Sequence, residues 1–319
     1  GIFSAGNQVM HKPSEFTPFT SELLKEICDS AFDETEFTTF LGGPEVGAAF
    51  TQLKFDHLLF TGSGNIGKHV MRAASENLVP LTLELGGKSP VIVSDSSNID
   101  ITARRVMFNK TLNAGQICLA PDYVYVHETE KDNFVEACKT QVNEFYSDLK
   151  YNPDYTSVIN QKHYDRLNGL LSDAKDHGAE LVEINPANED FSQQESHKIP
   201  PTLVLNPTDE MQIMKEEIFG PLLPIKTYKD INEPINYINK NDKPLGLYYF
   251  GNNKNEEEKV VNSTTSGGVT VNDIMGHIQQ NELGFGGVGP SGMGKYDGFD
   301  GFMNFSNNKP IYKQIGFGL

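Results

Sequence analysis

Short apolar runs alternate with helix-like patterns along the first third of the chain, and this alternation constrains the fold more than any other feature. The apolar spacing predicts helices over residues 19–32, 46–53 and 62–78. The expected strands are residues 7–11, 38–41, 55–61, 81–84 and 90–93. Strands that alternate with helices are typical of a parallel, doubly wound α/β sheet.

The same pattern restarts after Gly86, which predicts a second α/β unit. The elements expected there are strands over residues 90–93 and 123–126 and helices over residues 132–146 and 161–177. Residues 183–200 are polar and predict a surface loop. Glycines crowd residues 284–301, which predicts tight turns in place of regular structure. Residues 305–311 predict an exposed strand. A chain of 319 residues is long enough for two domains.

Charge and hydropathy exclude several classes of partner. The formal net charge is −17 and the isoelectric point is about 4.8, so a surface of this kind repels nucleic acid and anionic lipid. No apolar run approaches the roughly 20 residues of a membrane-spanning helix. No basic stretch followed by an apolar stretch opens the chain, so the expected location is cytoplasmic. The histidines and cysteines show no metal-ligand spacing, and no metal site is expected.

Three widely separated cysteines do not indicate a disulfide framework. Cys28 and Cys138 lie in helical patterns and are expected in the core. Cys118 differs, because it ends the run Asn-Ala-Gly-Gln-Ile-Cys, where small and amide-bearing residues suggest access for a reactive thiol. On composition alone, a buried structural cysteine is the better interpretation of this position too.

A carboxylate upstream changes the weight of these alternatives. Glu84 ends an apolar strand, is followed by a Leu-Gly-Gly-Lys run and precedes Cys118 by 34 residues. A thiol and a carboxylate are the nucleophile and general base needed to form and hydrolyse a thioester. Apolar neighbours are expected to raise the pKa of Glu84, which suits a base that works near neutrality. The structural alternative for Glu84 is a strand-end carboxylate that caps the next element.

The Glu84-Leu-Gly-Gly-Lys88 run, the Gly115-Gln-Ile-Cys118 run and their spacing resemble the aldehyde dehydrogenase superfamily. The resemblance implies NAD(P)-dependent oxidation of an aldehyde to a carboxylic acid, with Cys118 as nucleophile and Glu84 as the base for hydrolysis. It also implies an α/β fold with an incomplete Rossmann-type cofactor domain over residues 1–84. A catalytic α/β domain is implied over residues 85–290, and a C-terminal return segment with an oligomerisation strand over residues 291–319.

Cofactor residues follow from the same resemblance. In the family, a Lys-Pro-Ser-Glu run holds the adenosine ribose, and here it places Lys12 and Glu15 at the cofactor. A carboxylate at Glu15 repels a 2′-phosphate and favours NAD, with NADP as the alternative. By itself this run is an ordinary turn.

Two further motifs complete the implied cofactor site. The Phe-Thr-Gly-Ser run between a strand and a helix assigns Gly62, Ser63 and Gly67 to the pyrophosphate, although a plain strand-to-helix turn explains it equally well in isolation. The Glu-Ile-Phe-Gly-Pro run matches the family's Glu-x-Phe-Gly-Pro, which assigns Glu217 to the nicotinamide ribose and Phe219 to the nicotinamide ring.

The resemblance is strongest to a branch that acts on aromatic aldehydes, so coniferyl aldehyde or a related small molecule is the implied substrate and a homodimer the implied assembly. Family members carry a Pro-Trp-Asn run before the Lys-Pro-Ser-Glu motif, and its asparagine donates an oxyanion hydrogen bond. This chain contains no tryptophan, which predicts a fragment or a truncated, impaired product, because one oxyanion donor contributes about 10²–10³ in turnover. A silent homologue that only binds or assembles is the alternative. Transfer to coenzyme A is disfavoured by Glu84.

Overall fold

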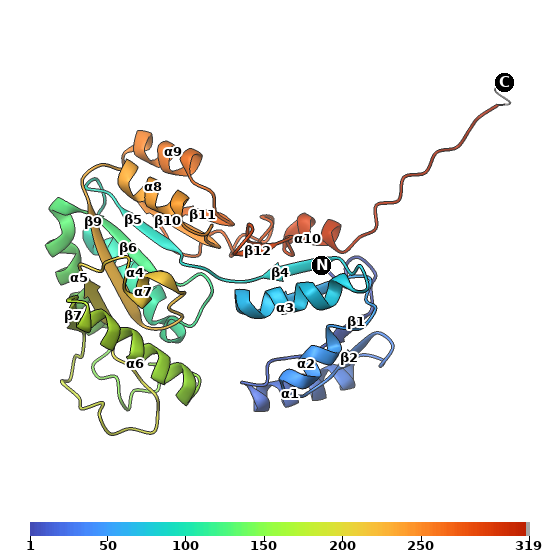
Figure 1. The fold of residues 1–319 in the computed structure, drawn as a ribbon, viewed down its shortest axis with the longest axis horizontal. Helices are drawn as coiled ribbons and strands as arrows, with labels where there is room; N and C mark the ends of the chain where they lie inside the picture. The colour runs from blue at the N-terminus through green and yellow to red at the C-terminus, as the bar shows by residue number, and fades with distance from the viewer. Residues whose placement is uncertain (317–319) are drawn as a thin grey trace.

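The computed structural model describes residues 1–316, which form two α/β parts joined by a long extended segment. The first part contains β1 (Val9–His11), α1 (Pro18–Ala31), β2 (Phe37–Thr39), α2 (Pro44–Phe50), β3 (Leu58–Thr61), α3 (Gly64–Ser75) and β4 (Leu81–Glu84). The second part begins at β5, and its chain leaves β4 through the segment that crosses between the two parts in Figure 1.

The second part is built on a seven-stranded sheet in the order β11-β10-β5-β6-β9-β8-β7, parallel except for β7. Its strands are β5 (Pro90–Val93), β6 (Tyr123–His127), β7 (Glu180–Glu183), β8 (Thr202–Leu205), β9 (Leu222–Tyr228), β10 (Gly246–Phe250) and β11 (Gly268–Val271). Its helices are α4 (Ile99–Thr111), α5 (Lys131–Phe145), α6 (Gln161–Asp176), α7 (Gln212–Lys215), α8 (Asn232–Lys240) and α9 (Lys254–Ser263). The predicted second α/β unit is therefore confirmed.

Both faces of this sheet are covered, which explains why β5 is apolar and buried at every position. Side chains of β5 alternate between two buried clusters, with Val91 and Val93 in one and Ile92 in the other. Continuous apolar strands are what a parallel sheet with helices on both faces requires. Cys138 on α5 is fully buried in the first cluster, and Cys28 on α1 is also buried, as the sequence predicts.

The first part departs from the single doubly wound sheet that the sequence predicts. β1 pairs only with β2, and β3 pairs with β4, so residues 1–316 contain two separate small sheets there. Figure 1 shows the β1–β2 unit with α1 and α2 below α3, apart from β3 and β4. Helix α1 leaves large apolar side chains in solvent, and Phe19 is 85% exposed. Helix spacing was predicted correctly here, whereas strand pairing was not.

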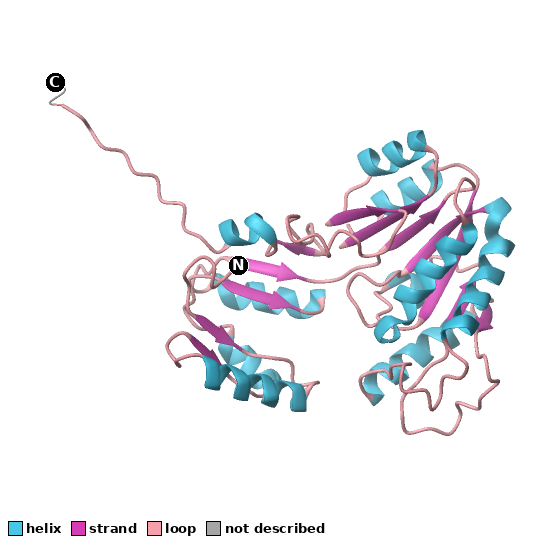
Figure 2. Cartoon of the chain, turned by 180° about the vertical axis from the view of Figure 1, so that it is seen from behind, coloured by secondary structure: helices cyan, strands magenta, loops and turns pink. Residues whose placement is uncertain are grey.

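Two predictions near the C-terminus are corrected. The glycine-rich segment contains β12 (Gly292–Met293), which pairs antiparallel with β4, and α10 (Gly298–Asn304), a helix where only turns were expected. Residues 305–311 form no strand within the described chain, because no neighbouring strand lies beside them, and Figure 2 shows this segment leaving the body of the molecule. Residues 317–319 of the predicted C-terminal segment lie outside the described residues.

Candidate active site

The thiol loop, defined here as residues 112–122 between α4 and β6, has an unusual backbone. Asn113 and Ala114 have φ of 52° and 53°, and Gly115 follows with φ of 71°. Such left-handed backbone is costly for residues other than glycine and persists only where the surroundings impose it. A Cβ at Gly115 would overlap the carbonyl oxygen of Gly220, so glycine is required at this crossing.

Distant parts of the chain anchor the thiol loop. The Gln116 amide donates to the Ser157 carbonyl at 3.0 Å and accepts from the Ile159 N–H at 2.9 Å. The buried Tyr248 hydroxyl donates to the Leu119 carbonyl at 2.7 Å. These bonds fix the backbone on both sides of the cysteine. Gln116 is part of the Gly115-Gln-Ile-Cys118 run, and the structure gives its side chain this anchoring role.

Cys118 is half-buried and packs against the core of the second part. Burial, and then the charges of the nearby Glu217 and Glu84 carboxylates, raise the pKa of its thiol to about 11. The N–H groups of Cys118 and Leu119 lie near the sulfur and act in the opposite direction. The structure therefore brings two predicted carboxylates within electrostatic reach of the predicted nucleophile, whose thiol carries its proton at neutral pH.

Glu84 is the last residue of β4 and pairs with Thr61 on one side and Gly292 on the other. Its side chain is 3% exposed, and neither carboxylate oxygen has a hydrogen-bond partner within the described chain. A Cβ at Gly286 would lie 3.1 Å from Oε1, so the glycine-rich segment closes over this carboxylate. Burial, and then the charge of Asp297, raises the pKa of Glu84 to about 8. The predicted upward shift is confirmed, and its predicted cause, desolvation, comes first.

Glu217 lies in the loop that leads into β9. Burial raises its pKa to about 7, and the Asp122 charge adds to the effect, while an N–H of Gly87 lowers it. A Cβ at Gly86 would overlap the Glu217 carboxylate, so this side chain contacts the backbone that follows Glu84. Phe219 has a left-handed backbone with φ of 46° and is 37% exposed. Strained backbone of this kind is concentrated at functional sites.

The predicted pyrophosphate turn lies beside Glu84, because the Gly62 N–H donates to the Glu84 carbonyl at 3.0 Å. Gly62 and Ser63 are exposed at the N-terminus of α3, and no atom lies within 4 Å of a Cβ built on Gly64. Open space at the N-terminus of a twelve-residue helix fits a phosphate group. Gly67 differs from the others, because it is buried and a Cβ there would meet Leu85 at 2.8 Å. The absence of a side chain at Gly67 therefore allows helix α3 to pack closely against Leu85.

Lys12 and Glu15 form an ion pair at 3.0 Å, and the Lys12 ammonium also donates to the Pro13 carbonyl at 2.8 Å. The backbone N–H of Glu15 and the Lys12 hydrogen bond lower the pKa of the Glu15 carboxyl, so it is charged at neutral pH. A charged carboxylate can accept hydrogen bonds from the hydroxyl groups of a ribose. Lys12 and Glu15 belong to the β1–β2 unit, and Lys12 bonds to Glu15 and to the adjacent Pro13. A separate group of predicted site residues lies close together, namely Glu84, Cys118, Glu217 and Gly62.

Three residues to which the sequence assigned no role, Asp122, Arg166 and Lys88, hold this neighbourhood together. Asp122 ends the thiol loop and bonds to Lys88 and to the Ile218 N–H. Arg166 on α6 donates to the Ile218 carbonyl at 2.5 Å. Lys88 belongs to a quoted motif, but Asp122 and Ile218 are 96 residues apart, so no local pattern indicates their contact.

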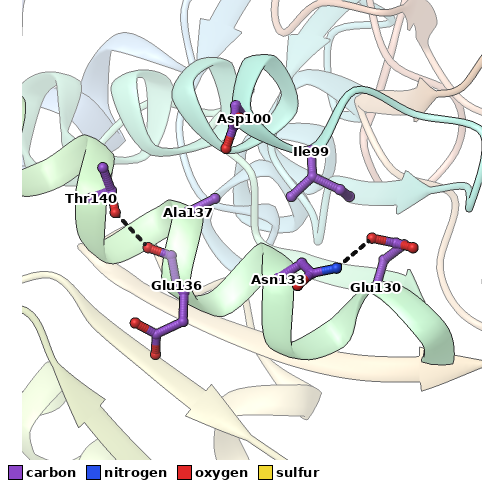
Figure 3. A pocket seen from close by; sticks show the side chains of 7 residues that line it. All are labelled: Ile99, Asp100, Glu130, Asn133, Glu136, Ala137 and Thr140. Atoms are coloured by element: carbon purple, nitrogen blue, oxygen red, sulfur yellow. Dashed lines mark hydrogen bonds between the residues drawn. The ribbon is translucent and has the colours of Figure 1, made fainter.

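A pocket elsewhere on the surface contains none of the predicted site residues. Figure 3 shows it between α4 and α5, where the Asn133 amide donates to Glu130 at 3.0 Å and Thr140 donates to the Glu136 carbonyl at 3.0 Å. Its polar groups bond to their own helix or its start. Across residues 1–316 no group of three or more His, Cys, Asp or Glu side chains is arranged to hold a metal ion. Over the same residues, no helix has the length and apolar content to span a bilayer.

Comparison with known proteins identifies the family of this chain. Residues 2–311 match the model of the aldehyde dehydrogenase family. The chain is 56% identical to the probable coniferyl aldehyde dehydrogenase of Caulobacter vibrioides over 99% of its own length and 65% of the relative's. It is 54% identical to the coniferyl aldehyde dehydrogenase of a Pseudomonas species over 100% of this chain and 66% of that one.

A solved structure confirms the fold. The substrate-bound AldH of Staphylococcus aureus superimposes with a TM-score of 0.89 at 41% identity, covering 98% of this chain and 68% of that one. The chain belongs to the aldehyde dehydrogenase family, and the predicted α/β fold of that family is confirmed. It spans slightly less than two thirds of the length of the two curated relatives.

Proposed function

We propose that this chain carries the chemistry of an NAD(P)-dependent aldehyde dehydrogenase. The observation that carries the proposal is Glu84, a buried carboxylate within electrostatic reach of the Cys118 thiol and without a hydrogen-bond partner in the part of the chain that the structure describes. Burying a carboxylate unpaired is costly, so its retention favours a chemical role over a structural one. Coniferyl aldehyde or another aromatic aldehyde is the proposed substrate, which rests on the names of the two curated relatives.

In the proposed reaction, the Cys118 thiol gives its proton to solvent water, and Sγ attacks the aldehyde carbon to form a thiohemiacetal. The N–H groups near the sulfur stabilise the oxyanion that forms on the former carbonyl oxygen. A nicotinamide held by Glu217 and Phe219 would supply the acceptor for the hydride that leaves the thiohemiacetal carbon, and a thioester would remain on Cys118. Glu84 then takes a proton from water, which attacks the thioester carbonyl and releases the carboxylic acid and the thiol.

The proposed cofactor residues fit this chemistry. The open turn at Gly62 and Ser63 would hold the pyrophosphate, while Lys12 and Glu15 would bind the adenosine ribose. A charged carboxylate at Glu15 supports NAD over NADP, since it repels a 2′-phosphate. Glu217 and Phe219 would bind the ribose and ring of the nicotinamide. Gly67 is proposed to act indirectly, by packing α3 against β4.

The proposed division of the chain follows these roles, with residues 1–84 for the cofactor, 85–290 for catalysis and 291–319 for the return segment and assembly. A homodimer is proposed because the C-terminal segment exposes apolar side chains, among them Ile311 and Ile315 at 73% and 95%. Light scattering of the purified chain measures this directly, and a monomer at micromolar concentration would contradict it. The cytoplasmic location stays a prediction.

One assay tests the proposed activity. The purified chain is mixed with coniferyl aldehyde and NAD⁺ or NADP⁺, and formation of the reduced nicotinamide is followed by absorbance. We expect turnover that Cys118→Ala abolishes and that Cys28→Ala retains, because Cys28 lies in α1 as a buried core residue. Absence of turnover and of Cys118 acylation in folded protein would favour the silent homologue. Turnover only with coenzyme A would favour acyl transfer.

A further inference from the structure

The segment Glu216–Gly220, here called the ribose loop, is held at its central residue, Ile218, by two charged side chains. The Ile218 N–H donates to Asp122 Oδ2 at 2.9 Å, and the Ile218 carbonyl accepts from the Arg166 guanidinium at 2.5 Å. Ile218 is fully buried and stands between the two residues proposed to touch the nicotinamide half of the cofactor. Hydrogen bonds to charged groups are roughly twice as strong as neutral ones. The two hydrogen bonds to Ile218 therefore restrain both of its neighbours, Glu217 and Phe219.

Asp122 also joins the ribose loop to the segment that follows Glu84. Its second carboxylate oxygen pairs with the Lys88 ammonium, four residues after that glutamate. Lys88 in turn donates to the Ile213 carbonyl at 2.7 Å and the Glu216 carbonyl at 2.9 Å. Asp122 is 3% exposed, so its charge requires these partners. The Asp122–Lys88 pair thus ties together the thiol loop, the segment after β4 and the ribose loop.

Close backbone contact means that displacement of the ribose loop disturbs its surroundings. The Gly115 α-carbon faces the Gly220 carbonyl with no space for a methyl group, and Gly86 faces the Glu217 carboxylate in the same way. Phe219 keeps its left-handed φ of 46° at a cost in free energy that its surroundings must offset. Anchors at Ile218, the preceding residue, supply that restraint.

We propose that Asp122 is a positioning residue, which sets the ribose loop against the thiol loop so that Glu217 and Phe219 meet the nicotinamide ribose and ring beside Cys118. The inference rests on the proposed function, because it assumes that these two side chains bind the cofactor. Arg166 shares the task through the carbonyl of the same residue, Ile218. Asp122 acts through the Ile218 N–H and contacts no reacting atom.

The test substitutes Asp122→Asn, which keeps the shape of the side chain but removes its charge from both Lys88 and the Ile218 N–H. Asp209→Asn is the matched control, because Asp209 also pairs with a lysine, Lys226 at 2.6 Å, but lies exposed on another part of the surface. The first readout is hydrogen exchange of the Ile218 amide without cofactor. We expect exchange at least about tenfold faster in Asp122→Asn and unchanged in Asp209→Asn, since a charge-assisted hydrogen bond is weakened.

The second readout is NAD⁺ affinity by calorimetry, together with the KM for NAD⁺ and kcat. We expect the Kd and KM of Asp122→Asn to rise about tenfold or more with a smaller change in kcat. The alkylation rate of Cys118 by iodoacetamide is expected to stay within about twofold, which shows that the thiol loop is intact. A change that affects alkylation, Kd and kcat alike would indicate general loosening and overturn the positioning role.

The outcomes separate the two proposals. If the wild-type chain binds no NAD⁺, the proposed function fails, and the Ile218 exchange rate alone judges the contact made by Asp122. Equal Ile218 exchange in Asp122→Asn and wild type overturns the inference, as does unchanged affinity in a chain that binds NAD⁺. If Asp122→Asn does not fold, Arg166→Met removes the other anchor from a partly exposed position, and the same two readouts decide.

Discussion

The end of β4 and the start of β6 each hold a buried carboxylate, and the fold treats the two in opposite ways. Within residues 1–316, Glu84 has no hydrogen-bond partner for either oxygen, and burial raises its pKa to about 8. Asp122 is just as buried, but one oxygen pairs with Lys88 and the other accepts from the Ile218 N–H. We propose that the unpaired carboxyl is kept for chemistry and the fully paired one for architecture, and the predictions below test this contrast.

The largest expected effect is on turnover, and it concerns the unpaired carboxylate. Glu84→Gln removes the proposed base, so we expect kcat to fall by about 10²–10⁴. The acyl group should then remain on Cys118, where intact-mass spectrometry detects it after mixing with aldehyde and NAD⁺. Glu258→Gln is the control, because Glu258 lies exposed on α9. Unchanged turnover in Glu84→Gln would show that another group activates the water.

The next largest effect is on folding, and it concerns the paired carboxylate. Asp122→Ala leaves the Lys88 ammonium and the Ile218 N–H without their partner, so we expect the free energy of unfolding to fall by about 3–5 kcal/mol. Urea denaturation measures it. Asp209→Ala removes the exposed partner of Lys226 and is expected to cost no more than about 1 kcal/mol. Equal losses in the two variants would mean that burial of the Asp122 pair contributes nothing.

Local patterns predicted the elements of the fold far better than their pairing. The strand over residues 81–84 and the helix over 161–177 match β4 and α6 to within one residue, because apolar periodicity is a property of neighbouring positions. Strand pairing depends on distant partners. The split between the β1–β2 sheet and the β3–β4 sheet, and the unpaired residues 305–311, were therefore not predictable from those segments alone.

The two carboxylates differ in the same way. Glu84 was found from its motif and from its spacing to Cys118, and its raised pKa followed from apolar neighbours in its own strand. The role of Asp122 depends on Ile218, and that of Lys88 on Ile213, which lie 96 and 125 residues away along the chain. Contacts at that separation leave no periodic signal. The assignment of Gly67 to the cofactor stays a prediction, whereas its packing against Leu85 is a tertiary contact that no local pattern indicates.

For each pH unit, a smaller effect is expected in the pH dependence of stability. The pKa of Glu84 rises from its ordinary 4.5 to about 8 on folding, so the folded chain binds one more proton than the unfolded chain between these values. Wild-type stability therefore loses up to about 1.4 kcal/mol for each pH unit across that window. Glu84→Gln lacks this loss, and its melting temperature should gain on the wild type from pH 5 to 8 and level off above. A constant difference between the two would contradict the raised pKa.

The smallest effect concerns Lys110, whose ammonium is fully buried. It is intermediate between the unpaired Glu84 and the fully paired Asp122, because within the described residues it makes one hydrogen bond, to the Pro121 carbonyl at 2.8 Å. Burial lowers its pKa to about 8, with the Asp122 charge opposing the shift. Lys110→Met removes a buried charge and one hydrogen bond together, and these effects offset each other to within about 1 kcal/mol at pH 7. Because the wild type regains stability as pH rises from 8 to 10.5, any advantage of methionine should shrink over that range in urea denaturation. If Lys110→Met lowered the free energy of unfolding as much as Asp122→Ala does, the number of hydrogen-bond partners would not decide how much a buried charge contributes to stability.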